Sequence, residues 1–504
     1  MHEIVLVGIN SRYSHSAFGL RYLRANLKEL RERSVIEEFV IGENPQNIAE
    51  KILRHTPKIV GIGTYIWNAP DVHNLIETLK KVSPQTTIVL GGPEVSHPPF
   101  RVDFSAADYI VPGEGEIGFY TLCRDLLAGT PPKSRIPAPT VPKLKALALP
   151  YDEYSDHDIA HRHIYVEASR GCPFECEFCL SAIDERVRMF DMERLMESFE
   201  KLWQRGARKF KFIDRTFNLN IRHAIRLIDF FLAKEEPCEL HFEVIPDHFP
   251  EALRERIKAF PPASLQLEIG IQTLNPEILA NIHRRMDLQK VRENIAFLEQ
   301  ETNAHLHLDL IVGLPGESLE SFANNLNTLK KMTDAEIQIG ILKKLSGTTL
   351  HRHDEVYGMV YSDIPPYDIL KNDLLSFETI QKMKRFARYW DIVYNSGNFR
   401  KTVTYIFDGE DVFGGFFDFS TWIFEETEST WQISLLRMTE LIFRYLTRKR
   451  GYDPTQIADT ILEDILRVGG RKIPGFLRDY ASHIPDLRKN RLDKSKKRQE
   501  LRTL

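Results

Sequence analysis

The chain has few cysteines and no long hydrophobic run, and both absences limit what it can be. Five cysteines in 504 residues are too few for a disulfide framework and suit a reducing compartment, so we expect a cytoplasmic protein. No apolar stretch approaches the roughly 18 residues that span a bilayer, so we expect no membrane partner. The N-terminus lacks the basic and small-residue regions of a signal peptide.

An excess of one charge is also missing. The formal net charge is −4, with 27% charged and 42% hydrophobic residues. Because nucleic-acid-binding domains carry a basic excess, we expect no nucleic-acid partner. Basic residues gather only in the last stretch, Arg488–Arg502, which we interpret as a solvated, frayed end. The chain is also too long for one core, so we expect several domains.

What the chain does have is a concentration of three cysteines within eight residues. Cys172, Cys176 and Cys179 follow the spacing C-x₃-C-x₂-C, and Phe178 precedes the third. A loop with this spacing can aim three thiolates at one point, one fewer than a closed zinc or iron–sulfur site uses. One coordination position is therefore left for a ligand that is not protein.

A zinc site is the alternative interpretation of these cysteines. Zinc usually takes four protein ligands, and His157, His161 or His163 could supply the fourth. Cys123 and Cys238 are distant in sequence, and each is interpreted as a small buried hydrophobe.

Strand and helix patterns alternate in residues 1–135, which predicts a doubly wound, Rossmann-like α/β domain with a parallel sheet. Ligands bind such sheets outside the carboxyl ends of the strands. Four segments whose residues are unusual for strands or helices lie at those ends, at 10–15, 64–68, 91–96 and 113–116. The expected strands are Glu3–Ile9, Val35–Ile41, Ile59–Ile66, Thr87–Leu90 and Tyr109–Val111.

The rest of the chain divides into three further parts. Residues 136–160 are proline-rich and predict a linker, and residues 161–360 show a second strand–helix series that predicts a partial barrel. Residues 361–504 carry long helical patterns and predict a helical domain with a basic tail, in which Trp390, Trp422, Trp431 and an aromatic, glycine-rich insert at Val412–Phe419 belong to the core. The expected barrel strands are Ile164–Ala168, Lys209–Ile213, Glu239–Val244, Ser264–Ile271, His305–Val312 and Glu336–Leu342.

The cysteine spacing, the aromatic residue before the last cysteine and the position after the first barrel strand resemble the radical S-adenosylmethionine (SAM) superfamily. The resemblance implies a (β/α)6 partial barrel and a [4Fe–4S] cluster held by Cys172, Cys176 and Cys179, with SAM on the fourth iron and Phe178 near the adenine. Motifs at later strand ends are similar to those of radical SAM barrels. They imply that SAM is met by Asp214, Glu243, Gly270, Gln272 and Gly313.

The N-terminal domain resembles a cobalamin (B12)-binding domain, because Thr64-x-Ile66 and Gly91-Gly92 have a compatible separation. The usual Asp-x-His-x-x-Gly motif is absent, and His15 lies in a segment that only echoes it. The alternative for this domain is a Rossmann-like domain that binds no such cofactor. Methylthiotransferases have a domain of this kind and bind a second iron–sulfur cluster in it through further cysteines, whereas this domain contains only Cys123. The B12 resemblance implies cobalamin contacts at Ser11, His15, Thr64, Gly91, Gly92, Glu94, Gly113 and Glu114.

Together these resemblances imply a B12-dependent radical SAM enzyme. The implied reaction is methylation of an unactivated carbon through a 5′-deoxyadenosyl radical and methylcobalamin, with the substrate in an interdomain cleft and a flavodoxin or ferredoxin as reductant. Two alternatives are a B12-assisted oxidation or cyclisation, as in anaerobic porphyrin cyclases, and a non-catalytic iron–sulfur or cobalamin carrier. The substrate itself cannot be deduced from the fold.

Overall fold

The computed structural model describes residues 2–468 and 471–484, and the chain divides into two compact units. The first unit runs to Glu243 and also includes Lys343–Arg352 and Tyr361–Asp368. The second unit holds Val244–Leu342, His353–Val360 and the residues from Ile369 onward. The chain therefore leaves the first unit after Glu243 and returns to it twice.

The first unit begins with a five-stranded parallel sheet, as predicted. Its order is β2-β1-β3-β4-β5, so the winding direction reverses between β1 and β3. In sheets of this kind the reversal opens a ligand-binding crevice at the carboxyl ends. The strands are β1 (Ile4–Asn10), β2 (Ser34–Val40), β3 (Ile59–Gly63), β4 (Thr87–Gly91) and β5 (Tyr109–Val111).

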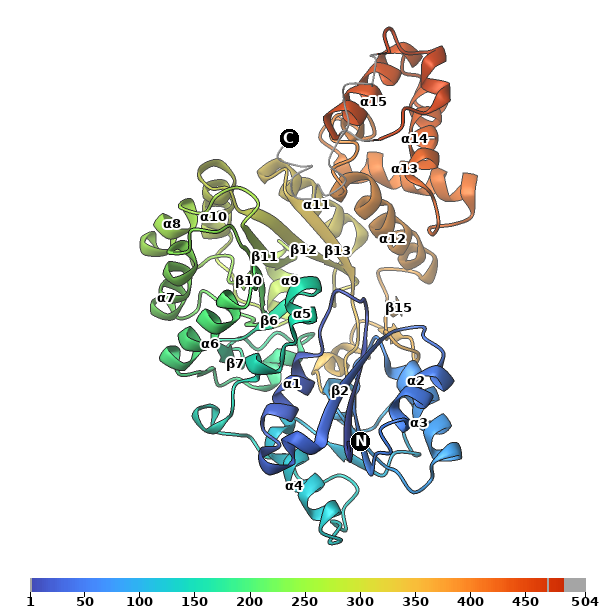
Figure 1. Ribbon diagram of the computed structural model, residues 1–504. Coiled ribbons are helices and arrows are strands. Elements are labelled where there is room, and N and C mark those ends of the chain that lie inside the picture. The colour runs from blue at the N-terminus through green and yellow to red at the C-terminus, as the bar shows by residue number, and fades with distance from the viewer. Residues whose placement is uncertain (1, 469–470, 485–504) are drawn as a thin grey trace. The chain divides into compact units, whose positions relative to one another are not determined.

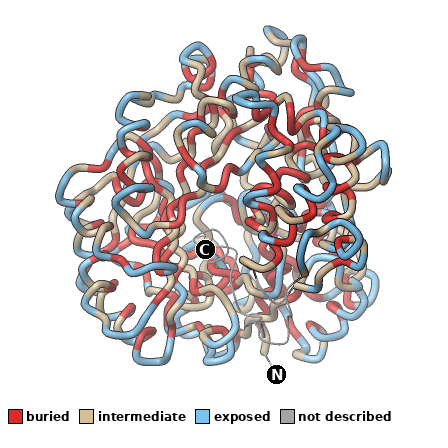
Figure 2. Tube along the Cα trace, turned by 90° about the horizontal axis from the view of Figure 1, so that it is seen from above, coloured by how far each residue is buried: buried red, intermediate tan, exposed pale blue. Residues whose placement is uncertain are grey.

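Helices cover both faces of this sheet (Figure 1). One core joins the sheet to α2 (Pro45–Leu53) and α3 (Ala69–Val82), and the other joins it to α1 (Phe18–Ala25) and α4 (Gly115–Leu127). Alternate residues of β1 enter opposite cores, which is the two-residue period of a strand buried on both faces. Figure 2 shows buried and exposed stretches alternating along the chain.

The proline-rich segment predicted as a linker is a packed part of the first unit. It forms the 3-10 helices Leu144–Ala146 and Pro150–Glu153 and the helix α5 (Asp156–His161). The Tyr154 hydroxyl donates to the Tyr165 carbonyl at 2.8 Å, and Asp158 pairs with Arg21 at 2.9 Å. Sequence identified the change in composition there, but did not reveal these contacts.

The second strand–helix series begins in the first unit. β6 (Ile164–Val166), β9 (Lys209–Phe212) and β10 (Glu239–Val244) are parallel, with α6 (Met192–Gln204) and α7 (Ile221–Leu232) between them in sequence. Two short strands were not predicted. β7 (Ser169–Arg170) and β8 (Arg188–Met189) pair antiparallel on either side of the cysteine run.

The series continues in the second unit with three more parallel strands, β11 (Leu265–Gln272), β12 (His305–Val312) and β13 (Glu336–Ile341). The six strands occur where the sequence predicts them. The helices of this part are α8 (Glu251–Lys258), α9 (Pro276–Asn281), α10 (Leu288–Glu301) and α11 (Leu319–Met332), and two short strands follow, β14 (Val360–Tyr361) and β15 (Ile369–Lys371).

The C-terminal part of the second unit is helical, as predicted, with α12 (Phe377–Trp390), α13 (Val412–Thr427), α14 (Leu435–Arg444) and α15 (Pro454–Val468). The supposed insert Val412–Phe419 is the first half of α13, whose N-terminus is capped by the Asp411 carboxylate. Trp390 is buried as expected, but Trp431 is 68% exposed, and that prediction was wrong. The Arg388 guanidinium lies over the Trp431 ring, 4.5 Å from its centroid, so this ring makes a cation–π contact at the surface. The basic tail Arg488–Arg502 lies outside the described residues.

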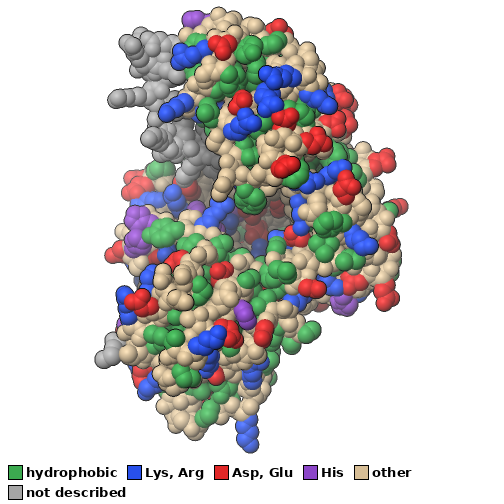
Figure 3. Space-filling view, turned by 90° about the vertical axis from the view of Figure 1, so that its right-hand side faces the viewer, with side chains coloured by type: hydrophobic (Ala, Val, Ile, Leu, Met, Phe, Trp, Pro, Cys, Tyr) green, Lys and Arg blue, Asp and Glu red, His purple; other side chains and the backbone are tan. Residues whose placement is uncertain are grey.

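Surface charge is mixed, in agreement with the low net charge. On the face seen in Figure 3, acidic and basic side chains alternate among hydrophobic ones over the described residues. Within the described ranges, no helix has both the length and the apolarity needed to cross a bilayer.

Candidate functional site

The cysteine run forms a loop held at its base by the β7–β8 ladder. Cys172 and Cys176 are buried and Cys179 is half-buried, as is Phe178. The Cys172 amide donates to the Asp184 carbonyl at 2.9 Å, and the Cys179 amide donates to the Cys176 carbonyl at 3.0 Å. None of the five cysteines, all of which are described, forms a disulfide.

Gly171 allows the backbone to enter this loop. Its φ is +90°, and a Cβ there would stand 2.4 Å from the Arg186 carbonyl oxygen. Only glycine tolerates both conditions. The chain thus turns sharply just before its first predicted cluster ligand.

The geometry does not favour the zinc alternative for the cysteines. Among the described residues, no group of three ligand atoms within 4.8 Å of one another includes these thiols. A single tetrahedral zinc ion, with Zn–S bonds of about 2.3 Å, needs sulfur separations of about 3.8 Å. The candidate fourth ligands have other contacts, since His157 lies 2.5 Å from the Tyr13 hydroxyl and 4.6 Å from the His161 ring, and His163 packs on His15.

Asp214, predicted to meet SAM, holds the start of the cysteine loop through hydrogen bonds. Its carboxylate is 4% exposed and accepts hydrogen bonds from the Ala168 amide at 2.9 Å and the Ser169 hydroxyl at 2.5 Å. Burial raises the pKa of this carboxyl to about 7. Asp214 therefore lies at the end of β9 and positions the chain that leaves β6.

Two arginines join the cysteine loop to the predicted cobalamin loop. Arg170 lies 2.6 Å from Glu114 and 2.7 Å from Glu116, and Arg188 pairs with Glu114 and, at 2.8 Å, with Asp184. Burial disfavours the charge of Arg170, but the neighbouring carboxylates hold its pKa above the usual value. Glu114, expected at cobalamin, is thus an ion-pair partner of the cysteine loop.

Two further carboxylates of this region are paired with arginines. Glu177, inside the cysteine loop, is buried and lies 2.7 Å from Arg352, which belongs to a segment that returns to the first unit. Glu243, predicted to meet SAM, lies at the end of β10 and pairs with Arg215 at 2.8 Å. Neither charge is left uncompensated.

The remaining predicted SAM residues lie at carboxyl ends of strands in the second unit. Gln272 has φ +68° and sits at a β-bulge that shifts the β11–β12 register after Gly270. Gly313 follows β12 with φ +91°, and a Cβ there would meet Ile369 at 2.8 Å. Bulges and left-handed residues at strand ends are features that redirect side chains beside ligand sites.

Glu317, which was not predicted, connects these two strand ends. Its carboxylate accepts from the Thr273 hydroxyl and from the Asn325 amide, each at 2.7 Å. It is buried, and burial raises its pKa to about 7. Gly313, four residues earlier, was chosen from sequence, but the long-range partners of Glu317 were not.

At the edge of the N-terminal sheet, the structure brings together Thr64, Gly91, Gly92 and Gly113. The Thr64 amide donates to the Gly91 carbonyl at 2.7 Å, and a Cβ on Gly92 would stand 2.5 Å from the Thr64 carbonyl oxygen. The unpredicted Ser96 hydroxyl donates to the Gly92 carbonyl at 2.8 Å and accepts from the Gly113 amide at 2.9 Å. These loops form a continuous edge at the carboxyl ends of β3, β4 and β5.

Asn68 ties this edge to the neighbouring strand, although sequence gave it no role beyond its place in an unusual segment. Its amide donates to the carbonyls of Ile9 and Gly63, both at 3.0 Å, so it joins the ends of β1 and β3. The Thr64 hydroxyl, by contrast, is buried and has no hydrogen-bond partner among the described residues.

The other predicted cobalamin residues have protein neighbours. His15 Nδ1 lies 2.5 Å from the Tyr165 hydroxyl, and burial lowers the pKa of His15. Glu94 is buried and accepts a hydrogen bond from the Tyr367 hydroxyl, and burial raises the pKa of Glu94. Ser11 is half-buried at the end of β1.

Comparison with known families agrees with this arrangement. Three family descriptions match successive parts of the chain: the B12 binding domain at residues 4–122, the radical SAM superfamily at 166–329, and a protein of unknown function (DUF4080) at 355–503. The chain thus carries a B12-binding domain followed by a radical SAM domain.

Similar proteins of known sequence include methyltransferases and methylthiotransferases. The enzyme is 25% identical over 403 residues to the "Uncharacterized methyltransferase PH0819" of Pyrococcus horikoshii, a match covering 73% of this chain and 86% of that protein. It is 24% identical to the cobalamin-dependent radical SAM methyltransferase TokK of Streptomyces tokunonensis, over 62% of this chain and 51% of that protein. The chain thus spans about half the length of TokK. Both of these relatives carry the name of methyltransferase.

Solved structures share the fold at low sequence identity. The radical SAM methyltransferase TsrM of Kitasatospora setae gives a TM-score of 0.58 at 17% identity, over 74% of this chain and 80% of that one. The cobalamin-dependent enzyme OxsB gives 0.60 at 11% identity, over 92% of this chain and 78% of that one. The radical SAM and B12-binding domains take a [4Fe–4S] cluster, SAM and cobalamin as cofactors.

The residues present suit these cofactors. Three cysteines on one loop, without a fourth on the loop, match a cluster that keeps one iron open. The buried Thr64 hydroxyl, which has no hydrogen-bond partner among the described residues, could donate to a ligand at this edge of the sheet.

Proposed function

We propose that this enzyme transfers a methyl group to an unactivated carbon of its substrate, using Cys172, Cys176 and Cys179 to hold the cluster. One observation carries the proposal: within the first compact unit, Arg170 and Arg188 connect the cysteine loop to the Gly113–Glu116 loop at the carboxyl edge of the B12-type sheet. When bound, the cluster and SAM supply a hydrogen-abstracting radical and cobalamin supplies the methyl group.

The chain's own residues bind, orient and shield these groups. We assign Gly270, Gln272 and Gly313 to SAM contacts, with Phe178 beside the adenine, because their backbone shapes suit close approach. Asp214 and Glu243 act as positioning residues, since both are engaged by protein groups. Thr64, Gly91, Gly92 and Gly113 are assigned to cobalamin, with Ser96 and Asn68 holding their loops together.

His15 and Glu94 are assigned to the rim of the cobalamin edge. The imidazole of His15 is already hydrogen-bonded to Tyr165, which argues against His15 as a lower ligand of cobalt. We further propose a cytoplasmic location and a flavodoxin- or ferredoxin-type reductant, which a low-potential cluster requires.

Anaerobically reconstituted full-length protein tests the proposal. Iron, sulfide and cobalt are quantified first, and the protein is then incubated with SAM and a chemical reductant. We expect 5′-deoxyadenosine together with S-adenosylhomocysteine, and transfer of deuterium from methyl-labelled SAM into methylcobalamin. A non-catalytic carrier would give neither product, and an oxidase or cyclase would give the first without the second.

Paired cysteine variants test the ligand assignment. Cys176→Ala should lose nearly all cluster iron and SAM cleavage. Cys238→Ala, which removes a buried thiol outside the loop, should keep both. Retained cleavage in Cys176→Ala would refute the assignment.

A further inference from the structure

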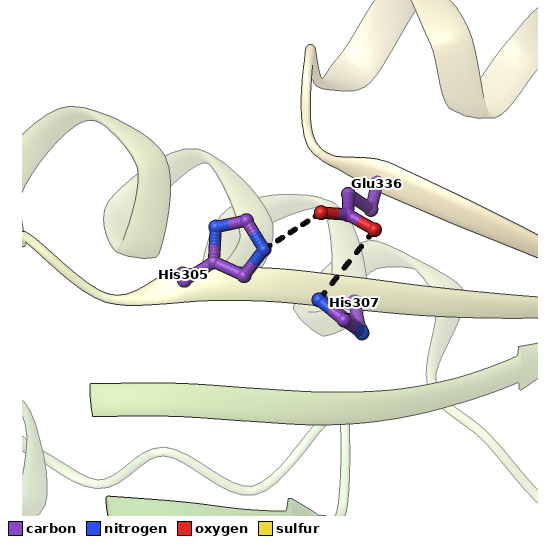
Figure 4. A group of neighbouring side chains, drawn as sticks. All are labelled: His305, His307 and Glu336. Atoms are coloured by element: carbon purple, nitrogen blue, oxygen red, sulfur yellow. Dashed lines mark hydrogen bonds and ion pairs between the residues drawn. The ribbon is translucent and has the colours of Figure 1, made fainter. Parts of the chain in front are cut away.

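A second cluster of metal-ligating side chains lies in the second unit, away from every residue assigned above. His305 and His307 alternate along β12 and share one face, while the intervening Leu306 is buried on the other. Glu336 begins β13 and is the register partner of His307. Figure 4 shows the Glu336 carboxylate between the two imidazole rings.

The distances between these three groups suit one small cation. His305 Nε2 lies 3.0 Å from one oxygen of Glu336, and His307 Nε2 lies 3.7 Å from the other. Tetrahedral zinc with bonds of about 2.0–2.1 Å needs donor separations of roughly 3.3–3.4 Å, which the two values bracket. All three ligand atoms lie within 4.8 Å of one another.

The low exposure of the three side chains, and the glutamine amides beside His307, also favour a metal. The side chains of His305, His307 and Glu336 are 9%, 15% and 2% exposed. The amide nitrogens (Nε2) of Gln338 and Gln266 lie 2.8 and 3.3 Å from His307 Nδ1. A glutamine amide can turn its oxygen toward Nδ1–H, which leaves the Nε2 lone pair for a metal and fixes the ring, as outer partners of zinc-bound histidines do.

The position separates this cluster from the SAM chemistry. His305 and Glu336 are the first residues of their strands, whereas Gly313 follows the carboxyl end of β12, roughly 25 Å away at about 3.3 Å per residue. The amino ends of barrel strands serve stability and not catalysis.

We propose that His305, His307 and Glu336 bind a zinc ion, with water as the fourth ligand, which links β12 to β13. Both histidines bind as neutral imidazoles, with the ring proton on Nδ1 and the Nε2 lone pair on the ion. Two histidines and one glutamate are an established ligand set for zinc. The ion stabilises the second unit and takes no part in methyl transfer.

Zinc analysis by mass spectrometry of the full chain tests this proposal. The cluster cysteines can trap zinc, so the measurement uses a background carrying Cys172→Ser, Cys176→Ser and Cys179→Ser. We expect close to one zinc ion per chain, as for a buried site with three protein ligands. Adding His305→Gln or Glu336→Gln should lower this at least fivefold. His351→Gln, which changes an exposed histidine, should leave it unchanged.

Chelation gives an independent reading if a variant folds poorly. EDTA should lower the melting temperature of the background protein, and His307→Gln should remove that effect. The proposal would be overturned if the background protein contained no zinc, or if all variants contained the same amount of zinc. Iron bound in place of zinc would also overturn it. Since the background lacks the cluster, these outcomes do not depend on the proposed methyl transfer.

Discussion

The guanidinium of Arg170 lies 2.7 Å from the Glu116 carboxylate and 2.9 Å from the Glu167 carboxylate. Arg170 stands two residues before Cys172, and Glu116 lies in the first turn of α4, beside the predicted cobalamin loop. The Arg170 side chain, which is 14% exposed, therefore helps to join the cysteine loop to the predicted cobalamin loop within the first unit.

Removing that cation should be costly. Arg170→Gln leaves the buried carboxylates of Glu116 and Glu167 without their partner, which typically destabilises a protein by about 3–5 kcal/mol. Urea denaturation followed by circular dichroism measures the loss. Arg54→Gln is the control, since it breaks an exposed pair with Glu50 and should cost less than about 1 kcal/mol. Equal effects would show that the Arg170 pairs are not a buried network.

Gly171→Ala should prevent cluster loading. The added Cβ would meet the Arg186 carbonyl at 2.4 Å, and the backbone could relieve this only by moving the Cys172 loop. Gly206→Ala is the matched control, because Gly206 has φ +96° with no atom within 4 Å of the added carbon. We expect the control to lose about 1 kcal/mol of stability but to keep full iron content after anaerobic reconstitution. Full iron in Gly171→Ala would contradict the assigned loop geometry.

Asp214 should make stability fall as the pH rises from about 4 to 7. The pKa of its carboxyl is about 7 in the folded protein and 3.8 as an ordinary aspartate, so unfolding releases a proton in this interval. The free energy of unfolding then declines by up to about 1.4 kcal/mol per pH unit from this group, and levels off above pH 7. Asp214→Asn should remove that slope in urea titrations between pH 5 and 8. An unchanged difference between parent and variant across this range would argue against a protonated Asp214.

Thr64→Val should leave the fold intact and weaken cobalamin binding. The substitution removes a buried hydroxyl that lacks a partner among the described residues, so stability should hold or rise by about 1 kcal/mol. Cobalamin affinity, measured by equilibrium dialysis, should fall several-fold. Thr402→Val is the contrasting variant, since it breaks the 2.7 Å bond to Asp464 and should lower stability without affecting cobalamin. Unaltered affinity in Thr64→Val would remove that residue from the proposed site.

The elements of the fold were predictable where the chain repeats a simple period. β1 enters two cores with alternate residues, and β10 and β12 were predicted with the bounds that the structure shows. α13 was misjudged because aromatic residues and two glycines obscure its helical period. Gly415 is explained by tertiary packing, since a Cβ there would stand 2.6 Å from the Asp408 amide nitrogen.

The site was predictable as a set of loops but not as a set of partners. Cysteine spacing and paired glycines are local signals, so Cys172, Gly91 and Gly92 could be chosen from sequence. Asp214 and Glu114 have the residue types of ligand contacts, and only the long-range hydrogen bonds and ion pairs show that protein groups engage them. Ser96 and Asn68 bond to backbone carbonyls that no sequence pattern specifies.

The two returns of the chain to the first unit, at Lys343–Arg352 and Tyr361–Asp368, mean that the polypeptide cannot be divided cleanly at the ends of its recognisable domains. A protein ended after residue 342 would keep the whole cysteine motif and the whole N-terminal sheet, yet Glu177 would lose Arg352 and Glu94 would lose Tyr367. Exchange of the C-terminal region between relatives, in evolution or in the laboratory, must therefore carry these two short stretches along or supply substitutes for them.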